Sequence, residues 1–275
     1  LQEVYNFKNI NKNTKLFGIT GSPLETTSSP SIHNAGFRAH AMNAVYIPIR
    51  SDSPDEAIDF ANKVGVRGLS VTFPHKESIL QELKQISEKT GAIGACNTII
   101  HGDSGWQGHN TDAIGLKKAL IAFTGFKSFR RKRVAIIGAG GAAKAAANVV
   151  KELKGHCCIF NRTVSRAREI AENYGFKYAF LGLESLDLLE SYSDIIIQAT
   201  SIGMKNKSAS HEKEDPLGFY DFRGHECVYD IVYEPKKTPL LQRAEKAGCK
   251  IKNGYTMLQY QAYEQFKLFT GEDYE

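Results

Sequence analysis

A glycine-rich segment, Gly138-Ala139-Gly140-Gly141-Ala142-Ala143, has the composition of a phosphate-binding turn. It follows an apolar run and opens a helix-like one, which is the context that the G-x-G-x-x-G/A pattern requires. The first glycine permits a tight turn, the second lets backbone amides approach a pyrophosphate, and the last small residue lets helix and strand pack closely. Such turns also occur as plain structure. The context favours a dinucleotide site that includes Gly138, Ala139, Gly140, Gly141 and Ala142.

A short basic segment indicates which dinucleotide binds there. The next apolar run ends in Asn161-Arg162-Thr163, at the place where an acid commonly holds the ribose hydroxyls. A carboxylate there would repel a 2′-phosphate, whereas the guanidinium of Arg162 can bind one through a planar fork of donors. Thr163 can cap the following helix, and Arg166 can reach the same side of its first turn. Ordinary basic residues on an exposed helix start are the alternative, but the missing acid favours NADP.

Polar residues also gather where other predicted strands end, in the segments 70–77, 91–100 and 108–115. Open α/β sheets bind ligands at the carboxyl ends of their strands. An enzyme that moves a hydride to or from an alcohol needs a group that exchanges the hydroxyl proton and a positive charge near the developing alkoxide. Lys76 and Asp112 are candidates for these tasks, although no spacing rule joins them. A solvated lysine at a helix start is the alternative for Lys76.

Short apolar runs alternate with helix-like segments along most of the chain, which predicts two α/β domains with a boundary near residues 112–130. In the first domain we expect a mostly parallel sheet, followed by a hairpin around Asp103-Ser104-Gly105. In the second, near-continuous apolar strands indicate a sheet covered on both faces. A polar loop over 205–216 interrupts the second series, and a long amphipathic helix ends the chain. The expected strands cover 15–20, 44–49, 68–73, 97–102, 105–110, 133–138, 156–161, 194–199 and 227–231, and the first helices 31–41 and 55–65.

The composition is that of a globular protein: 275 residues, 42% hydrophobic and 24% charged, with a net charge of +5. We find no apolar run long enough to span a bilayer and no signal-peptide pattern, so we expect no membrane partner. Five cysteines without metal-type spacing predict a reduced, cytoplasmic compartment and no bound metal. The densest basic run, 129–133, is better explained as a solvated turn than as a nucleic-acid site.

Nearly the whole chain resembles the shikimate dehydrogenase family. The resemblance is carried, in the family's order, by SVTFPHKE, GACNTI, GHNTDAIG, GAGGAAKA, NRTVSRA, ATSIGM, YDIVYEPKKTPLL and GYTMLQYQAYEQF. It implies the reversible, NADPH-dependent reduction of 3-dehydroshikimate to shikimate, a step of the shikimate pathway of aromatic amino-acid biosynthesis. It also implies a substrate domain formed by residues 1–115 and 253–275, to which the last helix returns, and a Rossmann-type NADP domain over 116–252.

The resemblance also implies roles for single residues. Lys76 matches the family's catalytic lysine and Asp112 its partner. Thr72, Asn97 and Gln261 match groups that bind the substrate's ring hydroxyls, and Tyr233 matches a tyrosine near the substrate carboxylate. Gly254 and Met257 match positions beside the nicotinamide, and Thr200 and Ser201 match the cofactor-side loop. From the sequence alone, Gln261 could equally be a solvated helix residue, Tyr233 a half-buried loop aromatic, Met257 core filler, and Thr200 with Ser201 strand-end caps.

The chain departs from the family at the segment expected to bind the substrate carboxylate. Thr27 and Ser29 stand where the family has two serines. Both hydroxyls remain, but the extra methyl group narrows the site, so a preference for shikimate or for quinate stays open. A non-catalytic NADP-binding sensor is the alternative from another class of protein. The first residues also resemble the junction in two-domain proteins that fuse a dehydroquinate dehydratase ahead of this dehydrogenase, so the chain could be the second half of such a protein.

Overall fold

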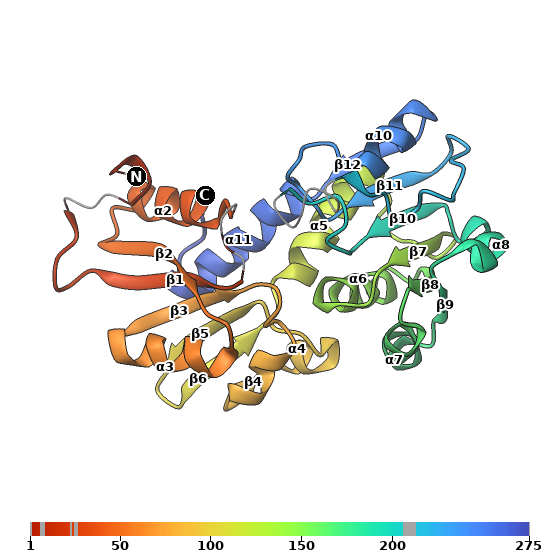
Figure 1. The fold of residues 1–275 in the computed structure, drawn as a ribbon. Coiled ribbons are helices and arrows are strands. Elements are labelled where there is room, and N and C mark those ends of the chain that lie inside the picture. Colours follow the sequence, from red (N-terminus) through yellow and green to blue (C-terminus); the bar gives the residue numbers. More distant parts are fainter. Residues whose placement is uncertain (1, 6–8, 23, 25–26, 206–212, 275) are drawn as a thin grey trace. The chain divides into compact units, whose positions relative to one another are not determined.

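The computed structural model describes residues 2–5, 9–22, 24, 27–205 and 213–274 (Figure 1). The chain forms two compact units: unit 1 consists of Leu1–Asp112 and Gln259–Glu275, and unit 2 of Ala113–Leu258. The chain passes between them at the start of helix α5 and again within helix α11. The boundaries expected from the sequence, at 115 and 253, differ from these by a few residues.

Unit 1 is built on a six-stranded sheet with the order β2-β1-β3-β5-β6-β4. Its strands are β1 (Lys15–Gly21), β2 (Ala44–Arg50), β3 (Val66–Val71), β4 (Gln85–Ile86), β5 (Thr98–Gly102) and β6 (Gly105–His109). Strand β1 pairs in parallel with both β2 and β3, whereas β5 pairs antiparallel with β3 and with β6. The β5–β6 hairpin confirms the prediction from the sequence.

Helices cover both faces of this sheet (Figure 1). They are α1 (Gln2–Tyr5), α2 (Ser29–Ala39), α3 (Pro54–Val64), α4 (Glu88–Ile93), most of α11 (Tyr255–Thr270), and the 3-10 helix η2 (Ser78–Glu82). Helix α3 begins and ends one residue earlier than the expected 55–65. The Ser53 hydroxyl accepts a hydrogen bond from the amide of Glu56 at its start, and Gly65, with a φ of 74°, ends it.

The alternation of side chains along β3 decides what each face contains. Leu69 and Val71 join the apolar cluster on one face together with Ala61 of α3. On the other face a Cβ added at Gly68 would lie 2.6 Å from Phe269 of α11. Ser70, between the two apolar residues, therefore shares its face with α11. A small residue and a polar one on this face let α11 approach the sheet closely.

Unit 2 is a parallel six-stranded sheet with the order β12-β11-β10-β7-β8-β9. Its strands are β7 (Arg133–Ile137), β8 (His156–Asn161), β9 (Lys177–Phe180), β10 (Ile195–Gln198), β11 (Cys227–Asp230) and β12 (Lys250–Asn253), and its helices α5 (Asp112–Thr124), α6 (Gly141–Glu152), α7 (Val164–Tyr174), α8 (Leu186–Ser191), α10 (Pro239–Lys246) and the 3-10 helix η3 (Leu183–Ser185). This is the strand order of a dinucleotide-binding fold, and it reverses between β7 and β10, the place where such sheets bind ligands. The Rossmann-type prediction is confirmed.

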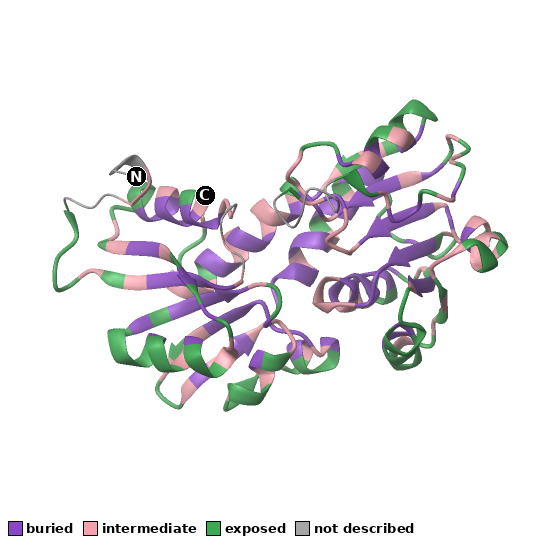
Figure 2. Ribbon diagram, viewed as in Figure 1, coloured by how far each residue is buried: buried purple, intermediate pink, exposed green. Residues whose placement is uncertain are grey.

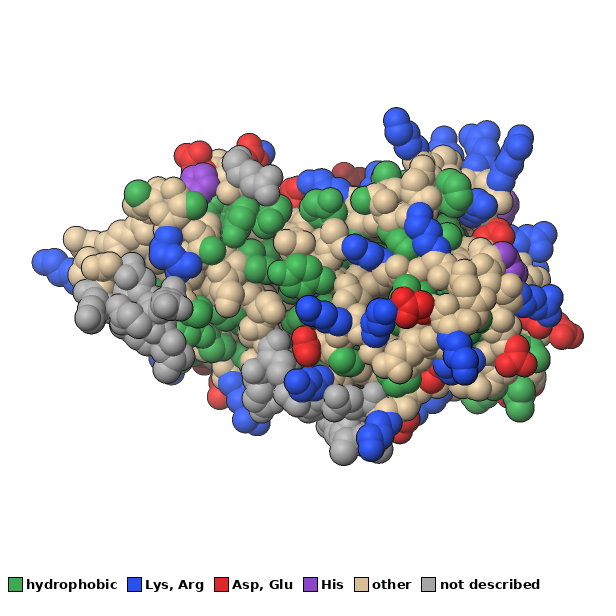
Figure 3. Space-filling model, turned by 90° about the horizontal axis from the view of Figure 1, so that it is seen from above, with side chains coloured by type: hydrophobic (Ala, Val, Ile, Leu, Met, Phe, Trp, Pro, Cys, Tyr) green, Lys and Arg blue, Asp and Glu red, His purple; other side chains and the backbone are tan. Residues whose placement is uncertain are grey.

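The central strands of unit 2 are buried and its edge is not (Figure 2). All four residues of β10 are buried, whereas three of the four residues of β9 are exposed. Three strands were not predicted: β4 has only two residues, and β9 and β12 contain no buried residue, so neither shows the near-continuous apolar pattern of the central strands. On the face that Figure 3 shows, Lys and Arg side chains are spread out, with Asp and Glu among them. In the described ranges, no helix is long and apolar enough to cross a bilayer.

Gly254, between β12 and α11, is fixed by backbone packing, which generates a stability prediction. A Cβ added there would lie 1.9 Å from the carbonyl oxygen of Ile231. The nearest atoms belong to the backbone and not to a flexible side chain, so Gly254→Ala should lower the free energy of unfolding by at least about 2 kcal/mol, or roughly 4–8 °C in Tm. Gly218→Ala is the matched control, because its nearest neighbour would lie 3.5 Å away. Calorimetry that gives both variants the wild-type Tm would contradict so tight a contact between Gly254 and Ile231.

Candidate active site

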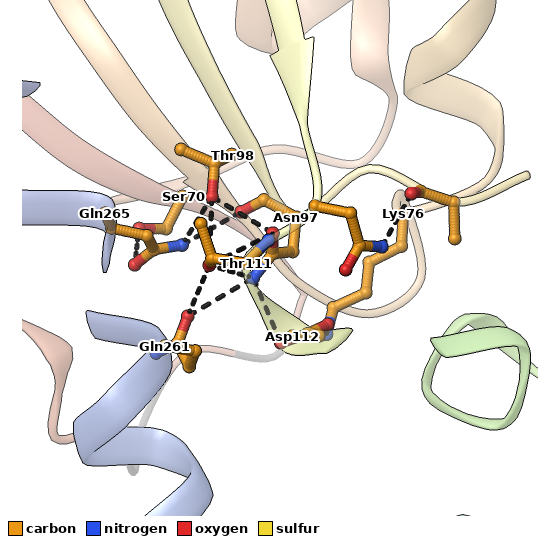
Figure 4. Close-up of polar contacts among 10 residues, drawn as sticks. Ser70, Lys76, Asn97, Thr98, Thr111, Asp112, Gln261 and Gln265 are labelled. Carbon is orange, nitrogen blue, oxygen red and sulfur yellow. Dashed lines mark hydrogen bonds and ion pairs between the residues drawn. The ribbon is translucent and has the colours of Figure 1, made fainter. Parts of the chain in front are cut away.

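Lys76 and Asp112, far apart in the sequence, form an ion pair in unit 1 (Figure 4). Lys76 Nζ donates to Asp112 Oδ2 at 2.5 Å, and the two side chains are 21% and 7% exposed. Lys76 follows β3, in a turn that His75 holds through a 3.0 Å bond between its Nε2 and the carbonyl of Ser51. Asp112 is the first residue of α5. Lys76 is therefore not the solvated lysine of the alternative interpretation.

Asn97, just before β5, holds the other oxygen of Asp112. Its Nδ2 lies 3.0 Å from Asp112 Oδ1, 2.9 Å from Thr111 Oγ1 and 3.2 Å from Gln261 Oε1. Its Oδ1 accepts from the backbone amide of Thr111 at 2.7 Å. The structure thus brings together four residues predicted from the sequence: Lys76, Asn97, Asp112 and Gln261. Gln261 is 7% exposed, which excludes the solvated alternative for it.

The other residues matched to the substrate lie in two places. In unit 1, Thr27 Oγ1 accepts from the amide of Ser29 at 3.3 Å, and Ser29 begins α2 with only 3% of its surface exposed. Thr72 is half-buried and its amide donates to the carbonyl of Thr20 at 2.9 Å. Tyr233 belongs to unit 2 and is half-buried, as its alternative explanation also expects.

In unit 2 the glycine-rich turn lies at the reversal point of the sheet. Gly138 has a φ of 112°, and a Cβ there would lie 2.8 Å from Thr200 Cγ2, in the loop after β10. Gly140 caps α6, and a Cβ there would meet nothing within 4 Å. Ala143 is fully buried against the sheet. The open space over the helix start and its free amides fit the pyrophosphate of a dinucleotide. Ala139 belongs to the same turn, and Gly141 and Ala142 begin the helix.

The segment after β8 places Arg162 on the surface, next to the start of α7. Asn161 Nδ2 donates to the carbonyl of Thr163 at 2.9 Å, and the amide of Arg166 donates to the same carbonyl at 3.1 Å. Thr163 occupies the N-cap position, but in this described segment its hydroxyl makes no capping bond, so the expected cap is wrong in that detail. The first turn of α7 contains no acid that would repel a phosphate.

The remaining cofactor candidates have contacts that also fit their alternatives. Thr200 Oγ1 accepts from the amide of Ile202 at 3.1 Å, as a strand-end cap does, and Ser201 is half-buried. Met257 is 5% exposed, as core filler would be. Gly254 is held against the backbone of Ile231.

Two polar residues missed from the sequence, Gln198 and Asp230, hold the loops at this edge of unit 2. Gln198 Nε2 donates to Asp230 Oδ1 at 3.2 Å, and its Oε1 accepts from the amide of Thr200. Asp230 also accepts from the hydroxyl of Thr238 at 2.6 Å, and burial raises its pKa to about 7. In the sequence, each of them is a polar residue at the end of an apolar strand, and this pattern could have revealed them. No group of three or more His, Cys, Asp and Glu suited to a metal occurs among the described residues.

Further residues that complete the network around Asn97 were not predicted from the sequence. They are Ser70, Thr98, Thr111 and Gln265. Gln265 follows Gln261 by four residues on a helix, so both amides lie on one face, and this spacing was the available signal.

Comparisons with known proteins identify the family. Residues 19–99 match the family described as the shikimate dehydrogenase substrate binding domain, and residues 120–212 match shikimate / quinate 5-dehydrogenase. The chain is 38% identical to the shikimate dehydrogenase (NADP(+)) of Thermococcus kodakarensis, over 94% of this chain and 92% of the relative. It is 35% identical to the chloroplastic bifunctional 3-dehydroquinate dehydratase/shikimate dehydrogenase of Arabidopsis thaliana, over 98% of this chain and 46% of the relative.

Solved structures give the same result. A crystal structure of a shikimate dehydrogenase in complex with NADP+ superposes with a TM-score of 0.84 at 36% identity, over 96% of this chain and 92% of the other. A quinate dehydrogenase from Corynebacterium glutamicum in complex with NAD superposes with a TM-score of 0.79 at 27% identity, over 94% and 95% of the two chains. Similarity of this extent, over nearly the full length of the first relative, shows that the chain belongs to the shikimate dehydrogenase family.

Proposed function

We propose that the chain catalyses the reversible, NADP-dependent reduction of 3-dehydroshikimate to shikimate. The observation that carries the proposal is the Lys76–Asp112 ion pair, in which each carboxylate oxygen has its own donor. Family membership supports it, because the relatives in Thermococcus kodakarensis and Arabidopsis thaliana carry this activity in their names.

The ion pair supplies the proton chemistry. Reduction of a carbonyl group develops negative charge on its oxygen, and that oxygen must gain a proton. The ammonium of Lys76 stabilises this charge and donates the proton, and in the oxidative direction its neutral form accepts one. Asp112, 7% exposed, orients the ammonium with little competition from water. Asn97 holds the carboxylate in place and, with Thr72 and Gln261, binds the ring hydroxyls.

The ends of the substrate and the cofactor are assigned by family resemblance together with local geometry. Family resemblance assigns Thr27, Ser29 and Tyr233 to the substrate carboxylate. The glycine-rich turn from Gly138 to Ala142 holds the pyrophosphate, while Asn161, Arg162, Thr163 and Arg166 hold the 2′-phosphate end. Thr200, Ser201, Gly254 and Met257 line the nicotinamide side. When bound, the nicotinamide donates or accepts the hydride.

Two alternatives concern the substrate and the class of protein. Quinate is the second candidate substrate, because a quinate dehydrogenase shares this fold and Thr27 alters the carboxylate site. A non-catalytic sensor would have no need of a paired lysine and aspartate, and this chain has kept both. All five cysteines are free, which supports the proposed cytoplasmic location. A dehydratase domain fused upstream, as in the Arabidopsis thaliana relative, is the proposed partner in a longer protein.

The catalytic assignment is tested by removing the ammonium. Wild-type protein should reduce NADP in the presence of shikimate, followed by absorbance, and Lys76→Ala should lower kcat at least about 100-fold while still binding NADP. Asp112→Asn should impair the same step, because the charge that orients the ammonium is lost. Lys63→Ala is the control, since Lys63 is an exposed lysine of the same unit. Near-normal turnover of Lys76→Ala would overturn the catalytic role of Lys76, and a wild-type protein that does not reduce NADP with shikimate would overturn the proposed function.

The choice of cofactor is tested at Arg162. Arg162→Ala should raise the KM for NADP roughly 10- to 150-fold and leave the KM for NAD nearly unchanged, because a charge-assisted bond to the 2′-phosphate is lost. Arg168→Ala serves as control: Arg168 lies on α7, the helix that follows Arg162, and is paired with Glu172 at 2.7 Å. Equal weakening of both cofactors by Arg162→Ala would show that Arg162 does not distinguish them.

The choice of substrate is tested at Thr27. If its hydroxyl donates to the substrate carboxylate, Thr27→Ser should change kcat/KM for shikimate by less than about tenfold. Thr27→Val keeps the shape but leaves a charged oxygen without its donor, so kcat/KM should fall roughly 10- to 150-fold. Quinate has an extra hydroxyl on the carbon that bears the carboxylate, so room gained in Thr27→Ser should favour quinate first. Full activity in Thr27→Val would mean that this hydroxyl does not hold the carboxylate.

A further inference from the structure

Gln265 closes the buried network behind Asn97 (Figure 4). It lies on α11 one turn after Gln261 and is 1% exposed. Its Nε2 donates to the carbonyl of Asn97 at 3.1 Å and to Thr98 Oγ1 at 2.9 Å. Its Oε1 accepts from Ser70 Oγ at 2.8 Å and faces His33 Nε2 at 3.3 Å. The amide group therefore has a partner in every direction, and the partners come from three different segments.

The direction of these bonds follows from the chemistry of two backbone groups. A carbonyl oxygen can only accept, so the side-chain amide of Gln265 must turn its Nε2, and not its Oε1, toward the backbone carbonyl of Asn97. The second proton of Gln265 Nε2 is then donated to Thr98 Oγ1. Because that hydroxyl oxygen accepts from Gln265, the Thr98 hydroxyl donates its own proton to Asn97 Oδ1, at 3.0 Å. The amide of Thr111 can only donate, and it also points to Asn97 Oδ1. Asn97 Nδ2 must therefore face Asp112.

The Oε1 atom of Gln265 is held by uncharged groups. Burial lowers the pKa of His33 to about 4, so its ring is neutral and donates from Nε2. The ring stacks on Tyr46 with centroids 4.3 Å apart, and Tyr46 OH donates to Ser70 Oγ at 2.5 Å. Gln265 thus cannot turn over without breaking bonds on both sides, each with a buried partner.

We propose that Thr98 and Gln265 are positioning residues that direct the amide of Asn97 toward Asp112 and so set the geometry of the Lys76–Asp112 pair. Thr98 is 0% and Gln265 1% exposed, so they act through Asn97 and not on the substrate. The inference rests on the proposed function, because it assigns Asn97 to the reacting site. It predicts that the hydroxyl of Thr98 matters for turnover, whereas a purely structural role would affect only the amount of folded protein.

The test is a threonine-to-valine change, which keeps the shape and removes the hydroxyl. Thr98→Val should lower kcat about 3- to 30-fold and raise the KM for shikimate, because one donor to Asn97 Oδ1 is lost. The KM for NADP should stay at its wild-type value, since the cofactor residues lie in unit 2. Thr98→Ser, which restores the hydroxyl, should return both constants to within about twofold of wild type.

Thr90→Val is the matched control. Thr90 is also fully buried in unit 1, and its hydroxyl bonds to Ser87 Oγ at 2.7 Å, outside the network of Asn97. It should lower Tm about as much as Thr98→Val and leave kcat and both KM values unchanged. Equal kinetic effects of the two changes would overturn the inference, as would Thr98→Val with wild-type constants.

A double-mutant cycle tests whether Gln265 acts through Thr98. Gln265→Met removes the amide at similar volume, and its loss of kcat should not add to that of Thr98→Val, because both break the same chain of bonds. If the losses multiply, Gln265 acts by another route and its assignment is wrong. If Gln265→Met does not fold, Gln265→Leu takes its place in the cycle.

Two experimental results distinguish a wrong proposed function from a wrong positioning role. Absence of shikimate-dependent NADP reduction by the wild-type protein would remove the proposed function and this inference with it. An inactive Lys76→Ala together with wild-type kinetics of Thr98→Val would leave the proposed function intact and remove only the positioning role.

Discussion

The structure of unit 1 depends on the burial of one carboxylate. A charged group that is 7% exposed is costly unless a counter-charge and hydrogen bonds replace the water that it has lost. Asp112 obtains the charge from Lys76 at one oxygen and an amide donor from Asn97 at the other. Removing one partner alone would leave the other buried without compensation. The segments that supply these three side chains must therefore meet at one edge of the sheet.

The antiparallel hairpin is what lets them meet. Lys76 follows β3, Asn97 precedes β5, and Asp112 follows β6. Because β5 runs antiparallel to both neighbours, its beginning lies beside the ends of β3 and β6. Backbone bonds fix the junction: the amide of Val71 donates to the carbonyl of Asn97 at 2.8 Å, and the amide of Asn97 to that of His109 at 3.2 Å. In a wholly parallel sheet, the start of β5 would lie at the amino ends of β3 and β6, away from Lys76 and Asp112.

The sequence predicted the elements better than it predicted the contacts between them. The alternation of apolar runs and helices indicated both sheets, because buried strands must be apolar. It missed β9 and β12, which contain no buried residue, and the short β4. It offered Lys76 and Asp112 as a pair only by their chemistry and by family resemblance. Gln265 and Thr98 were missed, because a buried amide or hydroxyl has no sequence signature until its partners from other segments are known.

The two units differ in how far a binding site can be inferred from a short segment, and the cause is physical. In unit 2 the predicted phosphate site uses backbone amides, and the backbone conformation itself demands glycine, as the φ of 112° at Gly138 shows. Local conformation leaves a local pattern. In unit 1 the site consists of side chains from the segments after β3 and before β5 and from α5 and α11, and each of them is an ordinary residue in its own segment. Only the shared need to satisfy a buried charge connects them, and that need acts through space and not along the chain.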